Sequence, residues 1–563
     1  MRGGIRAESY DSRLSVVLSV VAGWAIGIAL QFYPTLVSGF SRVQGDRADA
    51  RLNNYILEHG YRWLTGMPGH ERFWSPPVFY PVANTAAYSD VLLGVAPLYW
   101  PLRLAGLAPD SAFQSWMLAL ATLNFASAFI LFWRGFRCRP LASAVGAVVL
   151  SFAAMRTSQV MHAQLIAHCY IVLAIFALLR VFEPEPELRA GVTIVERRTV
   201  WIFALAAACV AQLYSSFYYG WFLCFALLIA ALWSLVLPGA RRRLVLAART
   251  NARALGAATA LGALALAPLA THYLSAEREI GARSFAMVEP LLPRVESWAY
   301  LGSHSWLYGW LASNEIFRAL PLEHEHRLGI GVATALLAAF GLWRARRRPS
   351  VQWMVLVPLT MAVLATEWPG GFTLWRAVYL VVPGADALRA VSRIAVAILF
   401  PASLGVALLI NAISRARRVP PSRAAVQIRR RDQRRRALAV VAIIAVVVAE
   451  QVTHPRSYDK LEARERVASV AAGIGASCDA FLYSTIGGDD DPWSYQADAM
   501  WASMEHGVPT INGYSGGEPP GWSFEDIRVR SAEQESVIVV ALARWEERRK
   551  LVAARVCRVR TPG

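Results

Sequence analysis

Two carboxylates with helical spacing stand just after the first apolar stretch of the chain. In GDRADARLNN, Asp46, Asp49 and Asn53 are three and four residues apart, so they share one face if this stretch forms a helix on a membrane surface. A carboxylate just outside a bilayer can take the proton of a hydroxyl group when partial burial raises its pKa toward neutrality. A structural role is equally open, with Asp46 as the helix N-cap and Asp49 supporting the first turn.

The same segment, residues 38–112, is predicted to be the first external loop and contains further titratable side chains. Glu58 and His59 lie in LEHGYRWL, and Asp90 ends the aromatic and proline-rich sequence FWSPPVFYPVANTAAYSD. We expect these three residues to contribute to a substrate-binding surface.

Cationic side chains between later apolar stretches are candidates for binding an anion. In MRTSQVMHAQ, Arg156 and His162 occupy positions where charge is costly unless water or an anionic group is close. The alternative for Arg156 is a helix-end arginine that reaches the lipid headgroups. In VVPGADALRAVSR, Arg389 and Arg393 are expected on one helix face, where like charges repel. A shared phosphate accounts for that pair, although Asp386 could neutralise Arg389 instead.

The sequence ALPLEHEHRLGIG places Glu323, His324, Glu325 and His326 at the mouth of an apolar stretch. Consecutive residues of a helix point about 100° apart, so a metal site made from these four alone is weak. We expect Glu323 or His324 to contact a substrate instead. No nucleotide-binding or metalloprotease motif is present in a convincing context. A divalent metal remains possible, but the sequence names no ligands for it.

Apolar stretches long enough to cross a membrane must position these groups. A span needs roughly 20 apolar residues, or fewer where it is buried among other helices. We place eleven spans near residues 14–37, 113–134, 141–156, 163–182, 199–214, 217–237, 253–273, 328–343, 351–366, 392–414 and 437–453. The apolar segment 89–107 is predicted to be a re-entrant or interfacial helix, because a twelfth span would place an arginine-rich loop outside.

Arginines cluster at alternate ends of these spans, at residues 134–139, 241–243, 344–348 and 415–436. Arginine-rich loops stay on the cytoplasmic side, so the N-terminus is predicted to be cytoplasmic and the C-terminus outside. The net charge of +18 therefore indicates topology and anionic lipids rather than nucleic acid. With 56% hydrophobic residues, the chain is neither disordered nor typical of a soluble enzyme. The mainly α fold is expected to be a polytopic membrane helical bundle.

Residues 454–563 differ from the preceding part, residues 1–453, and predict a small α/β domain outside the membrane. Strand-like pieces AFLYSTI and SVIVVAL flank a probable helix through Tyr495–Glu505. Cys478 and Cys557 could form a disulfide if this tail is outside. The loop NGYSGGEPPGW suits either a tight loop packed on the domain or a sugar-stacking surface.

The order of these pieces resembles the GT-C class of integral-membrane glycosyltransferases. LEHGYRWL, FYPVANTAAYSD, VPGADALRAVSR and PTINGYSGGEPPGW look like a bacterial branch of that class, over most of the chain. The resemblance implies a polyprenyl-phosphate sugar donor, an unknown envelope acceptor and the outer face of the inner membrane. It also implies a catalytic base in the first loop. Well-characterised members often have an Asp-Glu pair, whereas Arg47 follows Asp46 here, so the base is Asp46 or Asp49, with Asp46 favoured.

Read through that class, Arg156, His162, Arg389 and Arg393 are expected to stabilise the charge of the leaving polyprenyl phosphate. Two other classes remain open. A transporter or flippase predicts charged residues in the middle of spans, whereas here the polar groups cluster at external ends. A non-catalytic scaffold for envelope-polymer assembly predicts no penalty for removing Asp46 and Asp49 together.

Overall fold

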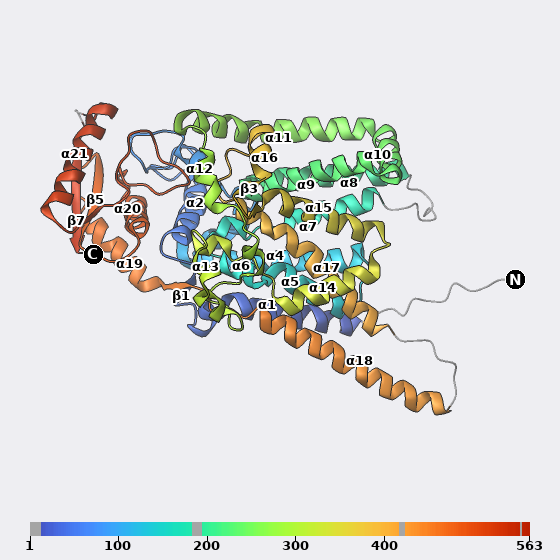
Figure 1. The fold of residues 1–563 in the computed structure, drawn as a ribbon. Helices are drawn as coiled ribbons and strands as arrows, with labels where there is room; N and C mark the ends of the chain where they lie inside the picture. The colour runs from blue at the N-terminus through green and yellow to red at the C-terminus, as the bar shows by residue number, and fades with distance from the viewer. Residues whose placement is uncertain (1–12, 183–193, 416–422, 552–553, 563) are drawn as a thin grey trace.

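The computed structural model describes residues 13–182, 194–415, 423–551 and 554–562, and these are mainly helical. Figure 1 shows a bundle of long helices with a small sheet and its helices at one end. The long helices of the bundle are α1 (Arg13–Val37), α4 (Pro109–Ile130), α5 (Pro140–Phe152), α7 (Cys169–Val181), α8 (Ile194–Ser215), α9 (Phe217–Val236), α11 (Ala252–Ile280), α14 (Val332–Ala345), α15 (Pro349–Ala365), α17 (Val396–Ser414) and α18 (Arg423–Glu450).

Each of the eleven predicted spans coincides with one of these helices. In the described part of the chain, eight helical segments are long and apolar enough to cross a membrane, while α14 and α15 are shorter apolar helices. The last predicted span is the second half of α18. Segment 89–107 contains only the short helices η2 (Ala96–Leu98) and α3 (Trp100–Leu104), so it is not a span. The chain is a multi-pass membrane protein.

Small residues let the central helices of the bundle approach closely. A Cβ atom added to Gly341 of α14 would lie 1.9 Å from the carbonyl oxygen of Gly405 of α17, so only glycine fits at this crossing. Close backbone contact of this kind drives helix association inside a bilayer, where apolar side chains gain little from leaving lipid. The helix α11 is the opposite case, since only 11% of its apolar window is buried inside the protein.

The loop after α1 contains the short strand β1 (Arg42–Gln44) and the helix α2 (Asp49–Leu64). The strand β1 pairs in antiparallel register with β4 (Ser457–Asp459), which follows α18. The Arg42 guanidinium strengthens this pairing with hydrogen bonds to Ser457, at 2.9 Å to its hydroxyl and 2.6 Å to its carbonyl oxygen. The first loop is therefore tied to the chain that leaves the last span.

The C-terminal segment forms a three-stranded parallel sheet in the order β6 (Arg528–Val529), β5 (Ala480–Ile486) and β7 (Val556–Pro562). The helices α19 (Lys460–Ala472), α20 (Pro492–His506) and α21 (Ala532–Arg549) accompany it, next to α2 at the left of Figure 1. The predicted strand AFLYSTI is β5 and the predicted helix lies within α20, so both are confirmed. The predicted strand SVIVVAL is wrong, because these residues belong to α21.

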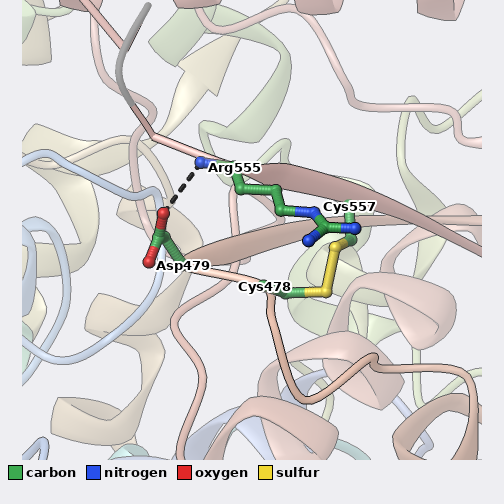
Figure 2. The surroundings of a disulfide bond; sticks show 4 residues. All are labelled: Cys478, Asp479, Arg555 and Cys557. Carbon is green, nitrogen blue, oxygen red and sulfur yellow. Dashed lines mark hydrogen bonds between the residues drawn. A yellow bond between two sulfur atoms is a disulfide. The ribbon is translucent and has the colours of Figure 1, made fainter.

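Cys478 and Cys557 form a disulfide that joins the segment before β5 to β7. Figure 2 shows Asp479 beside it, whose carboxylate accepts a backbone hydrogen bond from Arg555 at 2.8 Å. The disulfide that the sequence indicated as one alternative is therefore present.

An ion cluster, made of Arg47, Arg51, Arg466, Asp490 and Asp498, joins the α2 region to the C-terminal segment. Arg51 of α2 donates to Asp498 of α20 at 2.5 Å, and Arg466 of α19 donates to the same carboxylate at 2.9 Å. Arg47 donates to Asp490 at 2.8 Å, and Arg466 also contacts Asp490. The side chains of Arg51 and Asp498 are only 5% and 1% exposed, so this part of the contact is almost fully shielded from water.

The remaining loops at this end contain short elements, some of which carry candidate residues. They are α6 (Ala154–Ser158), α12 (Phe285–Val288), η7 (Gly309–Ser313), α13 (Glu315–Arg318), η8 (Glu323–His326), α16 (Trp375–Val381) and η9 (Val391–Ala395). At the opposite end of the bundle lies α10 (Pro238–Thr250), which contains Arg241, Arg242 and Arg243.

Candidate active site

Asp46 lies in the turn before α2. Because the helix begins at Asp49, the prediction that Asp46, Asp49 and Asn53 share one helical face is wrong. The Asp46 Oδ1 atom instead accepts backbone hydrogen bonds from Ala48 and Ala50, both at 3.2 Å. Burial, helped by the negative charge of Asp49, raises the pKa of Asp46 to about 6. This carboxylate thus supports the helix start and also has the proton affinity of a base that works near neutral pH.

Asp49, in the first turn of α2, is held by two side chains from distant parts of the chain. Its Oδ1 atom accepts a hydrogen bond from the Tyr514 hydroxyl at 2.6 Å, and its Oδ2 atom lies 3.2 Å from Nδ1 of His162. Burial alone would raise the pKa of Asp49, but the contacts with His162 and Tyr514 and the charge of Arg393 outweigh it and lower the pKa. Asp49 therefore stays ionised at a pH where Asp46 takes up a proton.

His162, Glu325 and Arg393 continue from Asp49 as what we call the alternating charge row. The His162 Nε2 atom lies 3.6 Å from Oε1 of Glu325, and that oxygen accepts a hydrogen bond from the Arg393 guanidinium at 2.7 Å. The Ser392 hydroxyl donates to the second Glu325 oxygen at 3.2 Å. Negative and positive charges thus alternate from Asp49 to Arg393.

The charge row fixes the protonation of its members. Burial and the charge of Arg393 would lower the pKa of His162, but Asp49 and Glu325 outweigh them and raise it to about 9. Burial would raise the pKa of Glu325, but Arg393 and His162 hold it well below its usual value. At neutral pH the row is therefore fully ionised, whereas Asp46 beside it titrates at about pH 6.

Tyr218 of α9 lies between the charge row and a more exposed cationic region. The Arg393 guanidinium stacks over the Tyr218 ring at 4.9 Å, and the Tyr218 hydroxyl accepts backbone hydrogen bonds from Arg389 and Ala390, both at 3.1 Å. Burial lowers the pKa of Arg283, and the positive charge of nearby Arg389 adds to the effect. Two arginines therefore lie close together at this edge of the site.

The predicted common helix face of Arg389 and Arg393 is wrong. The chain is irregular after Pro383 and Gly384, and the helical turn η9 begins only at Val391. As a result Arg393 is buried in the charge row, whereas Arg389 is exposed.

Arg156 is buried, so the alternative that it reaches the lipid headgroups is wrong. Its guanidinium donates to the Tyr219 hydroxyl at 2.6 Å and to the Ile166 carbonyl oxygen at 2.8 Å, and it lies 2.8 Å from Nδ1 of His168. Because both terminal nitrogens are bonded to protein groups, this geometry does not support the predicted anion contact. Arg156 instead braces the segment that follows His162.

Glu58 and His59 are enclosed in α2 and do not reach the charge row, in contrast to the prediction. The Glu58 carboxylate is fully buried and accepts hydrogen bonds from Arg62 at 3.0 Å, Tyr99 at 2.9 Å and Arg103 at 2.7 Å. His59 Nδ1 lies 2.7 Å from Nδ1 of His70, and burial lowers the pKa of His59 to about 4. Both residues therefore stabilise the loop after α2.

Asp90, Glu323 and His324 border the site. Asp90 accepts the backbone hydrogen bond of Phe217 at 2.5 Å and so holds the start of α9, while burial raises its pKa to about 6. The Glu323 carboxylate pairs with Arg327 at 2.5 Å and accepts a hydrogen bond from the Tyr300 hydroxyl. These two contacts engage the carboxylate that was expected to contact the substrate. His324 is exposed at the surface, next to the buried Glu325.

Sequence reasoning missed Glu325 and Tyr514. Glu325 lies in the EHEH sequence, but the alternation of residue types gave no indication of which glutamate faces inward. Tyr514 lies in the NGYSGGEPPGW loop, which packs against the site, and its ring also stacks on Trp493 at 5.0 Å between ring centres. Among the described residues, no group of three or more His, Cys, Asp or Glu side chains is arranged to hold a metal ion.

Comparison with solved structures shows the fold. The chain is similar to an oligosaccharyltransferase from Archaeoglobus fulgidus in the apo form, with a TM-score of 0.51 and 11% identity over 90% of this chain and 65% of that one. It is also similar to the archaeal oligosaccharyltransferase AglB from A. fulgidus in complex with an inhibitory peptide and a dolichol-phosphate. That match has a TM-score of 0.56 and 11% identity over 95% of this chain and 69% of that one. The chain thus spans about two thirds of the length of these enzymes.

A further similar structure is ArnT from Cupriavidus metallidurans bound to undecaprenyl phosphate, with a TM-score of 0.45 and 13% identity over 89% of this chain and 90% of that one. The predicted resemblance to GT-C glycosyltransferases is confirmed as a fold. No curated protein matches the chain. The sequence model of a domain of unknown function, DUF6311, matches residues 68–428, which is more than half of the chain, and the chain therefore belongs to the DUF6311 family.

Proposed function

We propose that this protein is a membrane glycosyltransferase that moves a sugar from a polyprenyl-phosphate donor to an envelope glycan, lipid or protein acceptor. The observation that carries the proposal is the half-buried Asp46, with a pKa of about 6, beside a row of side chains that is fully ionised at neutral pH. A base in this position accepts a proton from a hydroxyl group, and the neighbouring fixed charges favour a polar transition state. The GT-C fold supports the same conclusion.

Asp46 is the better candidate for the base, and Asp49 for a positioning residue. The carboxylate of Asp49 is already engaged by Tyr514 and His162, which keep it ionised. Asp46 forms no ion pair among the described residues and accepts only backbone hydrogen bonds. A carboxylate without a cationic partner is the one that can take up a proton in the reaction.

The arginines near Tyr218 are suited to the leaving phosphate. The backbone of Arg389 donates to the Tyr218 hydroxyl, the charge of Arg389 helps to lower the pKa of Arg283, and Arg389 is exposed. Positioned cations are needed there because the departing polyprenyl phosphate takes up negative charge as its bond to the sugar breaks. The archaeal oligosaccharyltransferase of similar fold was solved with a dolichol-phosphate, which supports a polyprenyl-phosphate carrier for this chain.

The proposed step balances without a redox partner. The acceptor oxygen forms a bond to the anomeric carbon while the bond from that carbon to the phosphate oxygen breaks. The hydroxyl proton passes to the carboxylate of Asp46, and the electron pair of the broken bond leaves on the polyprenyl phosphate. Asp46 then releases its proton to water.

We also propose that this chemistry takes place at the outer face of a bacterial inner membrane, with the N-terminus in the cytoplasm. The arginine-rich α10 lies at the end of the bundle remote from the C-terminal sheet, as expected when arginine-rich loops remain cytoplasmic. The Cys478–Cys557 disulfide supports an oxidising compartment for the other end. Residues 1–453 would then be the membrane domain and residues 454–563 an accessory domain outside.

A transfer assay tests the proposal. Purified protein in lipid is incubated with a panel of radiolabelled polyprenyl-phosphate sugars and membrane extract as the acceptor source. We expect turnover of one donor and a loss of about 10²- to 10⁴-fold in Asp46→Asn, because the amide cannot accept the proton. Asp489→Asn is the matched control, since that carboxylate is fully exposed in the C-terminal segment. Intact donors throughout, or full activity of Asp46→Asn, would contradict the proposed function.

A further inference from the structure

The chain between α11 and α14 contains an apolar stretch that the rest of the protein does not cover. We call residues 303–322 the tryptophan loop. Trp306 and Trp310 of this loop are 61% and 68% exposed, more than any other tryptophan among the described residues. Further exposed apolar side chains of the loop are Leu307, Ile316 and Leu322. Large apolar side chains that gather at a surface in this way mark a contact with a partner.

Backbone pairing ties the tryptophan loop to the chain that follows α18. The backbone N–H of Trp306 donates to the Val452 carbonyl oxygen at 3.0 Å, and that of His454 donates to the His304 carbonyl oxygen at 2.8 Å. Figure 1 shows α13, which belongs to this loop, at the end of the bundle that faces the C-terminal sheet. The exposed tryptophans are therefore fixed at that end of the spans.

One carboxylate joins the tryptophan loop to the first turn of α14. Glu450, the last residue of α18, accepts backbone hydrogen bonds from Ala333 at 2.9 Å and from Thr334 at 2.7 Å. The Tyr308 hydroxyl donates to the same carboxylate. Because Tyr308 lies midway between the two tryptophans in the sequence, both tryptophans lie close to the point where α14 begins.

The helix α14 has an exposed apolar stripe that leads to the tryptophan loop. The stripe consists of Val332, Leu336, Phe340 and Trp343, which are all exposed. Their spacing of four, four and three residues places them on one face of the helix. At the far end the Arg346 guanidinium stacks over the Trp343 ring at 4.7 Å. The lipid-facing surface of α14 thus extends from an arginine-rich turn to the tryptophan loop.

The helix α14 is too short to cross a bilayer by itself. It has 14 residues and, at about 1.5 Å per residue, is about 21 Å long. The hydrocarbon core of a bilayer is about 30 Å thick, so about 9 Å of apolar surface is missing on this side of the bundle. Arginines follow α14 at its other end, which leaves the shortfall next to the tryptophan loop. The apolar side chains of the loop can supply the missing surface.

The backbone of the tryptophan loop is suited to the edge of a bilayer. Unpaired backbone groups are not tolerated next to lipid, because no water is there to bind them. In this loop the helical turns η7 and α13 pair them, and the N–H groups of Gly309, Leu311 and Phe317 donate to carbonyl oxygens three or four residues earlier. The exposed polar residues Asn314 and Glu315 suit the headgroup layer, where tryptophans are also enriched.

We infer that the tryptophan loop inserts Trp306 and Trp310 into the lipid leaflet at this end of the bundle. Their rings lie at the boundary between the acyl chains and the headgroups and extend the apolar surface of α14. The partner of this surface is the bilayer itself. The contact requires no sugar donor and no turnover, so it is independent of the proposed transferase activity.

Quenching of a fluorophore by modified lipids tests the contact. Trp310→Cys is labelled with a polarity-sensitive fluorophore and placed in phosphatidylcholine nanodiscs, in a chain whose four free cysteines are replaced by alanine. We expect blue-shifted emission, and a larger loss of emission with a lipid nitroxide near the glycerol than with one at the acyl-chain end. Val537→Cys is the matched control, because Val537 is equally apolar and 62% exposed but lies in α21, beside the C-terminal sheet.

A second arm uses the unchanged chain and so does not depend on the folding of a variant. Nanodiscs containing phosphatidylcholine with a diazirine near the glycerol are irradiated, and the labelled peptides are identified by mass spectrometry. Label on the tryptophan loop and on α14, with none on α21, supports the inference. Label on α14 without label on the loop overturns it, as does equal quenching at positions 310 and 537. Disulfide cross-linking of two unlabelled Trp310→Cys chains, in place of quenching, would assign the surface to a second copy and also overturn it.

Discussion

The alternating charge row and the ion cluster both lie around the start of α2, but the carboxylates in these two regions differ in their cationic partners. In the ion cluster Asp498 is 1% exposed and receives two arginines, Arg51 and Arg466. Beside the charge row, Asp46 is half-buried and has no cationic partner among the described residues. A buried carboxylate with two cations stays ionised and holds two parts of the chain together. A buried carboxylate without one has a raised pKa and can exchange a proton.

The largest effect that separates the two regions should be on stability. Asp498→Asn leaves the buried guanidinium of Arg51 without its carboxylate, and breaking a buried pair in this way costs about 3–5 kcal/mol. We expect a clear fall in the unfolding temperature, followed by tryptophan fluorescence in detergent.

Asp526→Asn is the matched control, because that carboxylate pairs with Arg528 at the surface and is 46% exposed. An exposed pair contributes at most about 1 kcal/mol. Equal changes in the two variants would mean that the ion cluster does not hold the C-terminal segment in place.

A smaller effect is expected of pH on the rate of transfer, through the protonation of Asp46 and of His162 in the charge row. Transfer requires ionised Asp46, so activity should fall about tenfold per unit below pH 6, as the carboxylate becomes protonated. It should fall again above pH 9, where His162 loses the proton that separates the charges of Asp49 and Glu325. The measurement is the initial rate of transfer from pH 4.5 to pH 10.

His162→Gln is the control for the upper limb, because the amide does not titrate. The variant should lose the fall near pH 9, and its acid limb should move to higher pH, because the positive charge of His162 no longer lowers the pKa of Asp46. A profile that is flat between pH 5 and pH 7 in the natural protein would exclude Asp46 as the base.

The smallest effect is expected from Tyr514→Phe. The change removes one hydrogen bond to Asp49, which keeps its contact with His162, so a loss of about 1 kcal/mol, or roughly fivefold in rate, is expected. Tyr483→Phe is the control, since that hydroxyl bonds Thr561 within the C-terminal sheet. A fall in rate in both variants alike would indicate a general loss of structure and not a role of the Tyr514 loop.

The membrane helices were predictable because apolar length alone identifies them. The predicted strand SVIVVAL shows where local composition misleads. Its valines and isoleucine favour a strand, but Ile538, Ala541, Leu542 and Trp545 are the buried residues, and their spacing of three and four is that of a helix face. The periodicity over a longer window was the better signal.

The candidate site was predictable only in part. Asp46, Asp49, His162 and Arg393 come together as polar groups at external span ends, which the sequence indicated. Glu58 does not join this group. Its three partners come from α2 itself and from the apolar segment 89–107, and no local sequence pattern indicates that they bury its carboxylate. Contacts between distant segments, such as that of Tyr514 with Asp49, are equally invisible in one sequence.

The pairing of β1 with β4 has a consequence for how the protein is made. The Arg42 guanidinium and its Ser457 partner are 415 residues apart. The strand β1, which precedes Asp46, can therefore pair with β4 only after α18 has left the ribosome. Contacts of such high sequence separation form late in assembly. A nascent chain stalled at any earlier span would hold an unfinished pocket. Synthesis and membrane insertion would then have to proceed past β4 before the first sugar could be transferred.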